Sequence, residues 1–177
     1  SPADSANIRV IVSDFEDNPQ QGEQILFEGL ESGAIYKGIS NDEGQFDILL
    51  KTGETYMIRI KGVGEAKDYN KIEIPALGEN EYYSTIELFV KFEQPRIFTL
   101  DNVEFEFGKA SLTKESFSEL EELREYLSLK EDIRVEIAGH TDDVGSEESN
   151  MILSVERAEA VRNYLISHGI SAERVIA

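Results

Sequence analysis

The first half of the chain reads as short strands separated by turns. Runs of β-branched and other apolar residues are interrupted by Gly, Asn, Asp and Pro. Asn41-Asp42-Glu43-Gly44, which lies between two such runs, is a strong signal for a hairpin turn. Residues 1–95 are therefore predicted to form an antiparallel β-sandwich. The expected strands cover residues 8–12, 24–27, 34–39, 45–50, 55–60, 71–75 and 84–92.

The pattern changes after Glu93-Gln94-Pro95, which we interpret as a linker. Two helices are expected beyond it, one capped by Thr113 and one by Ser146. Their apolar stripes are Phe117, Leu120, Leu123 and Leu127, and Val155, Ala158, Val161 and Leu165. Three further strands are expected at residues 102–107, 133–138 and 175–177. Residues 96–177 are therefore predicted to form a βαβαβ domain, an α/β sandwich.

The charge and composition exclude several classes of function. The 177 residues include 36 acidic and 17 basic ones, and both halves share the net charge of −19. Such a surface repels phosphates, so we expect no nucleic-acid partner. No apolar run approaches the roughly 20 residues of a membrane helix. Membrane association is therefore expected only through parts outside this stretch of chain, and a secretory signal is expected to be absent or removed.

The candidate chemistry lies in one stretch. Gly139-His140-Thr141-Asp142-Asp143-Val144-Gly145 is followed by Asn150 and by Leu153-Ser154-Val155-Glu156-Arg157-Ala158. The stretch is expected to run from a strand end through a loop into the second helix, which would bring Asp142 and Arg157 together. Their spacing favours a structural ion pair. The alternative is a split clamp, in which Arg157 binds a carboxylate through two hydrogen bonds and Asp142 binds an ammonium group.

Catalysis and metal binding find little support in the residues. No serine or cysteine nucleophile with a second supporting group accompanies His140, so we expect no enzyme activity. The chain has no cysteine and only two histidines, which argues against a metal site. No cofactor is expected either.

The pattern GHTD-x-x-G-x-x-x-x-N-x-x-LS-x-x-RA-x-x-V-x-x-YL resembles the OmpA-like C-terminal domain family, and the resemblance extends over residues 98–177. It implies noncovalent binding of peptidoglycan through the diaminopimelate of the stem peptide. Asp142 and Arg157 match the family's key aspartate and arginine. Asn150 matches its asparagine before the helical Leu-Ser, and Thr141 would line the pocket.

Two departures from that family are visible. Many relatives carry Asn or Asp where this chain has Gly108, so one polar contact to the ligand is expected to be missing. The family domain also usually continues past Ala177 through a further strand, and we expect this domain to be truncated there. Residues 1–95 resemble, more weakly, the carboxypeptidase-regulatory-like β-sandwich, through residues 38–46 and 53–56.

The resemblance implies a non-catalytic module that holds an envelope protein to the Gram-negative cell wall. Its expected place is the periplasm, in association with the outer membrane or the wall. Two alternatives stay open. The domain can belong to a larger envelope-remodelling enzyme whose active part lies elsewhere, or it can be a structural module that does not bind the wall.

Overall fold

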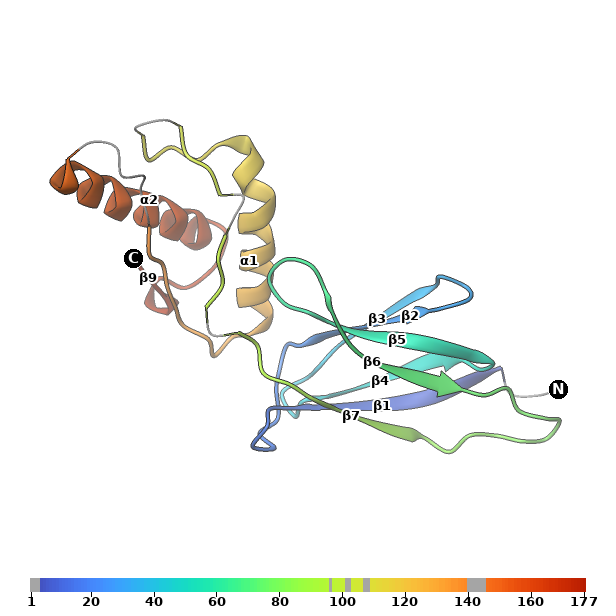
Figure 1. The fold of residues 1–177 in the computed structure, drawn as a ribbon. Coiled ribbons are helices and arrows are strands. Elements are labelled where there is room, and N and C mark those ends of the chain that lie inside the picture. The colour runs from blue at the N-terminus through green and yellow to red at the C-terminus, as the bar shows by residue number, and fades with distance from the viewer. Residues whose placement is uncertain (1–3, 96, 101–102, 107–108, 140–145) are drawn as a thin grey trace. The chain divides into compact units, whose positions relative to one another are not determined.

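The computed structural model describes residues 4–95, 97–100, 103–106, 109–139 and 146–177 (Figure 1). The chain divides into two compact units, Ser1–Arg96 (unit 1) and Ile97–Ala177 (unit 2). The division falls beside the linker expected at residues 93–95. Unit 1 is rich in strands, and unit 2 combines helices with short strands.

Unit 1 contains two sheets whose inner faces share one core. Alternation of buried and partly buried side chains is clearest in β1 and β5, as strands with one face on the core require. Fully buried core residues from both sheets include Ile8, Val10, Ile25, Phe27 and Tyr56. The first sheet has the order β4-β1-β7, with β4 Gln45–Lys51, β1 Ser5–Ser13 and β7 Ile86–Lys91. The second has the order β3-β2-β5-β6, with β3 Ile35–Ile39, β2 Gln24–Gly29, β5 Glu54–Lys61 and β6 Lys67–Ile74.

One strand pairing departs from the antiparallel arrangement predicted for unit 1. The last strand, β7, runs parallel to β1, with pairs from Ile8↔Ile86 to Ser13↔Lys91. A hairpin forces its two strands to be antiparallel, whereas a parallel pair needs a longer crossover. β6 and β7 belong to different sheets, so no hairpin turn fixes the direction of β7.

A tight turn is present at Asn41–Gly44, but it is not the predicted hairpin, because β3 and β4, which it connects, belong to different sheets. The side chain of Asn41 accepts hydrogen bonds from the backbone N–H groups of Glu43 and Gln45, at 2.9 and 3.0 Å. Gly44 has φ +76°, and a Cβ there would lie 2.7 Å from the carbonyl oxygen of Val12. Glycine is therefore required both by the backbone conformation and by the close approach of β1.

Unit 2 is built on two helices, α1 Phe117–Leu129 and α2 Glu147–Ser167. Ser146 caps α2, and its hydroxyl accepts the Ser149 N–H at 3.1 Å, as predicted. Thr113 instead precedes a 3-10 turn, η1 Lys114–Ser116, and its side chain makes no cap bond to it. The last three residues of each predicted apolar stripe are buried, but the first residues, Phe117 and Val155, are 41% and 51% exposed.

The strands of unit 2 are shorter than predicted. β8 Val135–Glu136 and β9 Val175–Ile176 form a parallel pair, and a second 3-10 turn, η2 Ala172–Arg174, leads into β9. The strand expected at residues 102–107 is represented in the described residues by an isolated antiparallel bridge between Phe105 and Leu112. The predicted βαβαβ order is thus present only in its later part.

Arg174 connects the end of α1 to the segment before β8. Its guanidinium donates to the carbonyl oxygens of Leu127 and Lys130 at 2.7 Å each, and to that of Ile133 at 3.0 Å. The last carbonyls of a helix have no partner within the helix, and a cation there also complements the helix dipole. Arg174 therefore fixes the C-terminal end of α1 against the chain that enters β8.

Candidate ligand-binding site

Helix α2 places Asn150 and Arg157 on one face. Seven residues correspond to almost two turns of an α-helix and to a rise of about 10.5 Å. The two side chains therefore point in nearly the same direction, one above the other. Ser146 and the acidic residues Glu147 and Glu148 stabilise the N-terminal end of this helix, which is the end nearer to Asn150.

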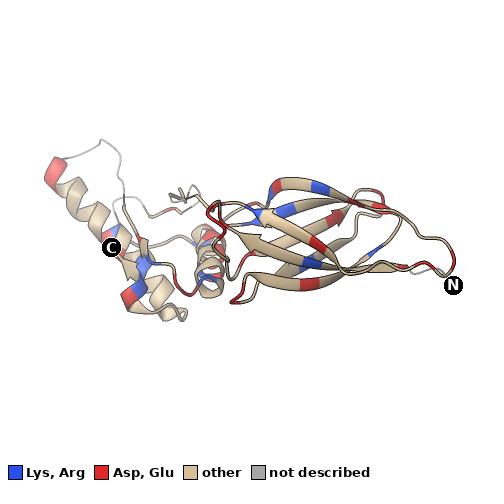
Figure 2. Cartoon of the chain, turned by 90° about the horizontal axis from the view of Figure 1, so that it is seen from below, with Lys and Arg blue, Asp and Glu red and all other residues tan. Residues whose placement is uncertain are grey.

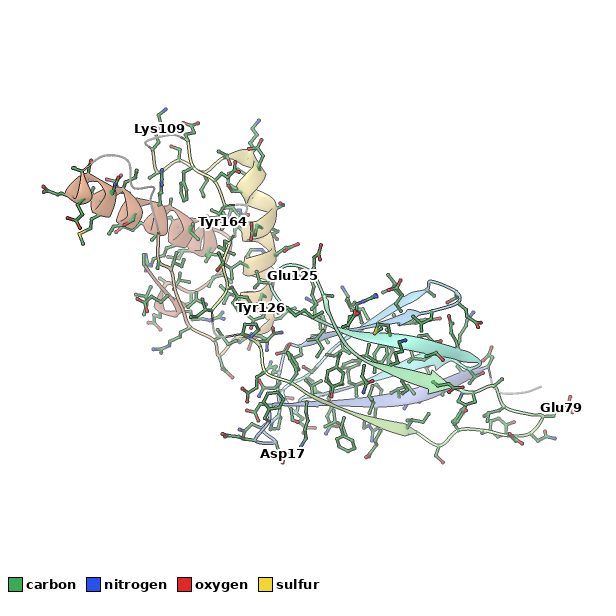
Figure 3. All side chains as sticks on the ribbon, viewed as in Figure 1. Asp17, Glu79, Lys109, Glu125, Tyr126 and Tyr164 are labelled. Atoms are coloured by element: carbon green, nitrogen blue, oxygen red, sulfur yellow. The ribbon has the colours of Figure 1, made fainter. Side chains whose placement is uncertain are left out.

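Arg157 contacts the segment of residues 103–113, far away in sequence. Its Nε atom lies 3.3 Å from the carbonyl oxygen of Lys109, to which it donates. Its guanidinium carbon lies 5.1 Å from the centre of the Phe105 ring, within the range of a cation–π contact. Figure 3 labels Lys109, which lies in this segment. Among the described residues, the guanidinium of Arg157 thus contacts a carbonyl group and an aromatic face.

The 103–113 segment is held together by its own hydrogen bonds. The N–H of Glu106 donates to the carbonyl oxygen of Ser111 at 3.1 Å, and the N–H of Lys109 donates to that of Glu106 at 2.9 Å. The N–H of Glu104 donates to the hydroxyl of Ser116, a fully buried residue, at 2.6 Å. The segment therefore offers Phe105 and the Lys109 carbonyl as fixed contacts for Arg157.

Gly139 brings the chain after β8 against α2. A Cβ at this position would lie 2.2 Å from the carbonyl oxygen of Ser154, closer than any side chain tolerates. Ser154 precedes Arg157 by less than one helical turn. The chain that leaves β8 is therefore packed at Gly139 against α2, less than one helical turn from Arg157.

The structure describes only part of the site predicted from the sequence. Arg157 and Asn150 lie on α2, with Arg157 half-buried. Thr141, Asp142 and Gly108 lie outside the described residues, so the pairing of Asp142 with Arg157 stays a prediction.

The sequence reasoning missed Phe105, the Lys109 carbonyl and Gly139. Gly139 could have been recognised, because a glycine at the end of a predicted strand often marks a close backbone approach. Phe105 lies in an alternating strand pattern and carried no separate signal.

Arg157 is a cation on a protein that is acidic throughout. Figure 2 shows Asp and Glu residues distributed over both units. The nearby Lys109 is paired, because its Nζ atom lies 3.1 Å from the carboxylate of Glu106 in an exposed ion pair. Arg157 is half-buried, and its contacts among the described residues are a carbonyl oxygen and an aromatic ring and include no carboxylate.

In the described part of the chain, no cluster of three or more His, Asp or Glu side chains is suited to hold a metal ion. Within the same residues, no helix combines the length and the apolar character needed to cross a membrane.

Residues 104–177 match the model of the OmpA family. The chain is 36% identical over 83 residues to outer membrane protein P5 of Haemophilus influenzae, an alignment that covers 46% of this chain and 24% of the relative. It is 41% identical over 87 residues to outer membrane protein A of Escherichia fergusonii, covering 48% and 36%. Outer membrane porin F of Pseudomonas fluorescens is 32% identical over 76 residues, covering 43% and 23%. The chain thus spans between 23% and 36% of the length of these relatives.

Proposed function

Because residues 104–177 carry an OmpA family domain, we propose that this domain binds peptidoglycan noncovalently through the diaminopimelate of the stem peptide. Arg157 takes the ligand's carboxylate, and Asp142 takes its ammonium group. The observation that carries the proposal is the setting of Arg157, whose described contacts are a carbonyl oxygen and an aromatic ring. A cation in that setting attracts an anionic group.

The chemistry of the ligand matches these two residues. The side-chain end of diaminopimelate carries both an ammonium and a carboxylate, so one anion and one cation are needed to bind it. Guanidinium binds a carboxylate through two parallel hydrogen bonds, which gives direction as well as strength. Asn150, on the same face of α2, and Thr141 complete the polar lining that we propose.

This binding has no catalytic step. The domain holds an envelope protein to the cell wall, from the periplasmic side of the outer membrane. The relatives support an envelope location, because they are named as outer membrane proteins. We further propose that residues 1–95 form a β-sandwich of carboxypeptidase-regulatory-like type, which the common core of the two sheets supports.

Substitution of the two charged residues tests the proposal. We expect Arg157→Ala and Asp142→Ala each to abolish retention of the protein on purified sacculi. Removal of one partner from a buried charge pair typically costs about 2–5 kcal/mol. Arg157→Lys keeps the charge but not the planar fork, so it should also lose most of the affinity.

The matched control is Arg134→Ala, which removes the same charge from an exposed position of unit 2. This variant should bind sacculi like the parent. Circular dichroism must show that every variant is folded. Normal retention of folded Arg157→Ala would contradict the proposed function.

A further inference from the structure

We infer that Phe105 is a positioning residue that fixes which edge of the Arg157 guanidinium faces the ligand, and that this edge selects a free carboxylate. The inference rests on the proposed function and names the chemical group that the site selects. It follows from the contacts of Arg157 with the 103–113 segment.

The guanidinium of Arg157 has five N–H groups. One lies on Nε and two lie on each terminal nitrogen. A carboxylate can dock side-on, against Nε and one terminal nitrogen, or end-on, against both terminal nitrogens. In this structure Nε donates to the Lys109 carbonyl oxygen at 3.3 Å. The end-on edge is therefore the edge left for a bidentate ligand.

The guanidinium carbon of Arg157 lies over the ring of Phe105, 5.1 Å from the ring centre. An aromatic face attracts the cation and excludes water from that side, which strengthens the other hydrogen bonds of the guanidinium. The ring and the Lys109 carbonyl together hold the arginine head in place.

Hydrogen bonds hold the backbone on which Phe105 lies. Phe105 forms an antiparallel bridge with Leu112, and the neighbouring Glu104 is bonded to the buried Ser116. The Glu104 carbonyl oxygen also accepts the N–H of Thr113 at 3.1 Å. The backbone that carries the ring is therefore held in place before the ligand arrives, which limits the conformational freedom lost on binding.

An end-on guanidinium presents two donors to the ligand. A carboxylate accepts both through its two oxygens. A carboxamide has one oxygen and an NH2 group, so its nitrogen faces a donor and one hydrogen bond cannot form. The geometry therefore selects stem peptides whose diaminopimelate keeps a free side-chain carboxylate over peptides in which that carboxylate is amidated.

The test compares two muropeptides that differ only in this group, titrated calorimetrically into the full chain. The parent should bind the carboxylate form at least about tenfold more tightly than the amide form. This is the loss of affinity expected when a charge-assisted hydrogen bond is replaced by an unpaired donor. Phe105→Leu keeps an apolar side chain but removes the ring face. It should weaken binding of the carboxylate form about fivefold and leave binding of the amide nearly unchanged. Phe105→Tyr keeps the ring and should behave like the parent.

The outcomes separate the inference from the proposed function. The folded Phe105→Leu variant can keep the parent's ratio of affinities for the two peptides, either with no loss of affinity or with an equal loss for both. In either case Phe105 is only structural and the inference is wrong. If the parent binds neither peptide, or Arg157→Ala binds as the parent does, the proposed function fails and the inference falls with it.

A second measurement does not depend on the folding of any variant. In nitrogen NMR spectra of the parent, the Nε–H signal of Arg157 should move little on addition of the carboxylate peptide, whereas the signals of the terminal nitrogens should move. A dominant shift of the Nε–H signal would mean side-on docking and would overturn the inference.

Discussion

Residue 139 has room for a hydrogen atom and no more. The Cβ of any other residue would lie 2.2 Å from the carbonyl oxygen of Ser154 and 3.1 Å from its carbonyl carbon. Both are backbone atoms of α2, which cannot rotate away as a side chain can. Gly139→Ala must therefore displace either the helix or the chain that leaves β8.

We expect Gly139→Ala to destabilise unit 2 by about 1–3 kcal/mol, the usual cost of overpacking. It should also weaken binding to sacculi, because it disturbs the packing of the chain that leaves β8 against the helix that carries Arg157. Thermal melting and sacculus retention measure the two effects. Gly78→Ala is the control, since its Cβ would meet only the flexible Glu81 carboxylate, at 3.4 Å. An unchanged melting temperature for Gly139→Ala would contradict the close packing.

Not every arginine of unit 2 can serve as a control for Arg157. Arg162 lies on the same helix, but its Nε atom donates to the carbonyl oxygen of Val175 at 2.8 Å. Its second contact is to the carbonyl oxygen of Ala172, at 3.4 Å. Arg162→Ala would loosen β9, so a loss of binding in that variant would say nothing about the ligand. Arg134 avoids this problem.

At the residue scale the sequence pointed to Arg157 and Asn150 but not to the residues that contact Arg157. Arg157 and Asn150 stand out because they belong to a spaced motif. Phe105 and Lys109 do not, because their contact with Arg157 exists only after the 103–113 segment folds back through the Phe105–Leu112 bridge. Such contacts depend on a chain reversal that no local pattern encodes.

The end of helix α1 carries an unusual cation. Lys130, the C-cap residue, is 5% exposed, and its Nζ atom lies 5.6 Å from the centre of the Tyr126 ring. Burial lowers the pKa of Lys130 to about 8. Burial likewise raises the pKa of Tyr126 to about 12. Both groups thus favour their neutral forms in the folded state.

The stability of unit 2 should therefore rise between pH ~8 and pH ~10. A lysine in an unfolded chain titrates near pH ~10.4, so in this window the unfolded state binds the proton more than the folded state does. Stability then increases with pH, and below pH ~8 the cost of the buried charge is fully present. The full effect is about 3 kcal/mol.

Urea unfolding followed by the helical circular dichroism signal measures this dependence. Measurements should stay below pH ~10, where tyrosines of the unfolded chain begin to ionise. Lys130→Met is the matched control, since it keeps an unbranched side chain without the charge, and its stability should vary less over the window. An equal slope in both proteins would show that burial of Lys130 does not set the dependence.

Helices were more predictable than strands in unit 2. An amphipathic stripe is a local signal, and the last three residues of each stripe are buried as expected. The first residue of each stripe, Phe117 or Val155, is exposed, because its burial depends on how far the partner element extends. The length of a strand also depends on its partner. A strand was expected over residues 133–138, but β8 pairs with β9 over only two residues.

On the scale of the whole molecule, the two units should be separable in function. The family match and all described contacts of Arg157 lie after residue 96. We expect isolated unit 2 to bind sacculi as tightly as the full chain does. Isolated unit 2 with Arg157→Ala is the negative control. A folded unit 2 with clearly weaker retention would show that unit 1 takes part in binding.

The topology of unit 1 was predictable only in part. Each strand has a local pattern, and the seven expected strands all occur. The pairing partners of each strand could not be predicted from local patterns, because β1 pairs with β4 and β7, which are distant in sequence. Nothing in the pattern of residues 84–92 indicates whether that strand continues the sheet of β6 or crosses to the sheet of β1.

The parallel pairing of β1 with β7 has a mechanical consequence. The chain enters β1 at Ser5 and leaves β7 at Lys91, and in a parallel pair these points lie at opposite ends of the ladder. Tension between the start of unit 1 and the linker therefore acts along the strands and loads the ladder in shear. The pairs from Ile8↔Ile86 to Ser13↔Lys91 bear that load together, so they must break as a group and cannot unzip one at a time. Tension that a wall-bound unit 2 transmits through the linker would therefore load the β1–β7 ladder in shear, the direction in which the ladder resists extension.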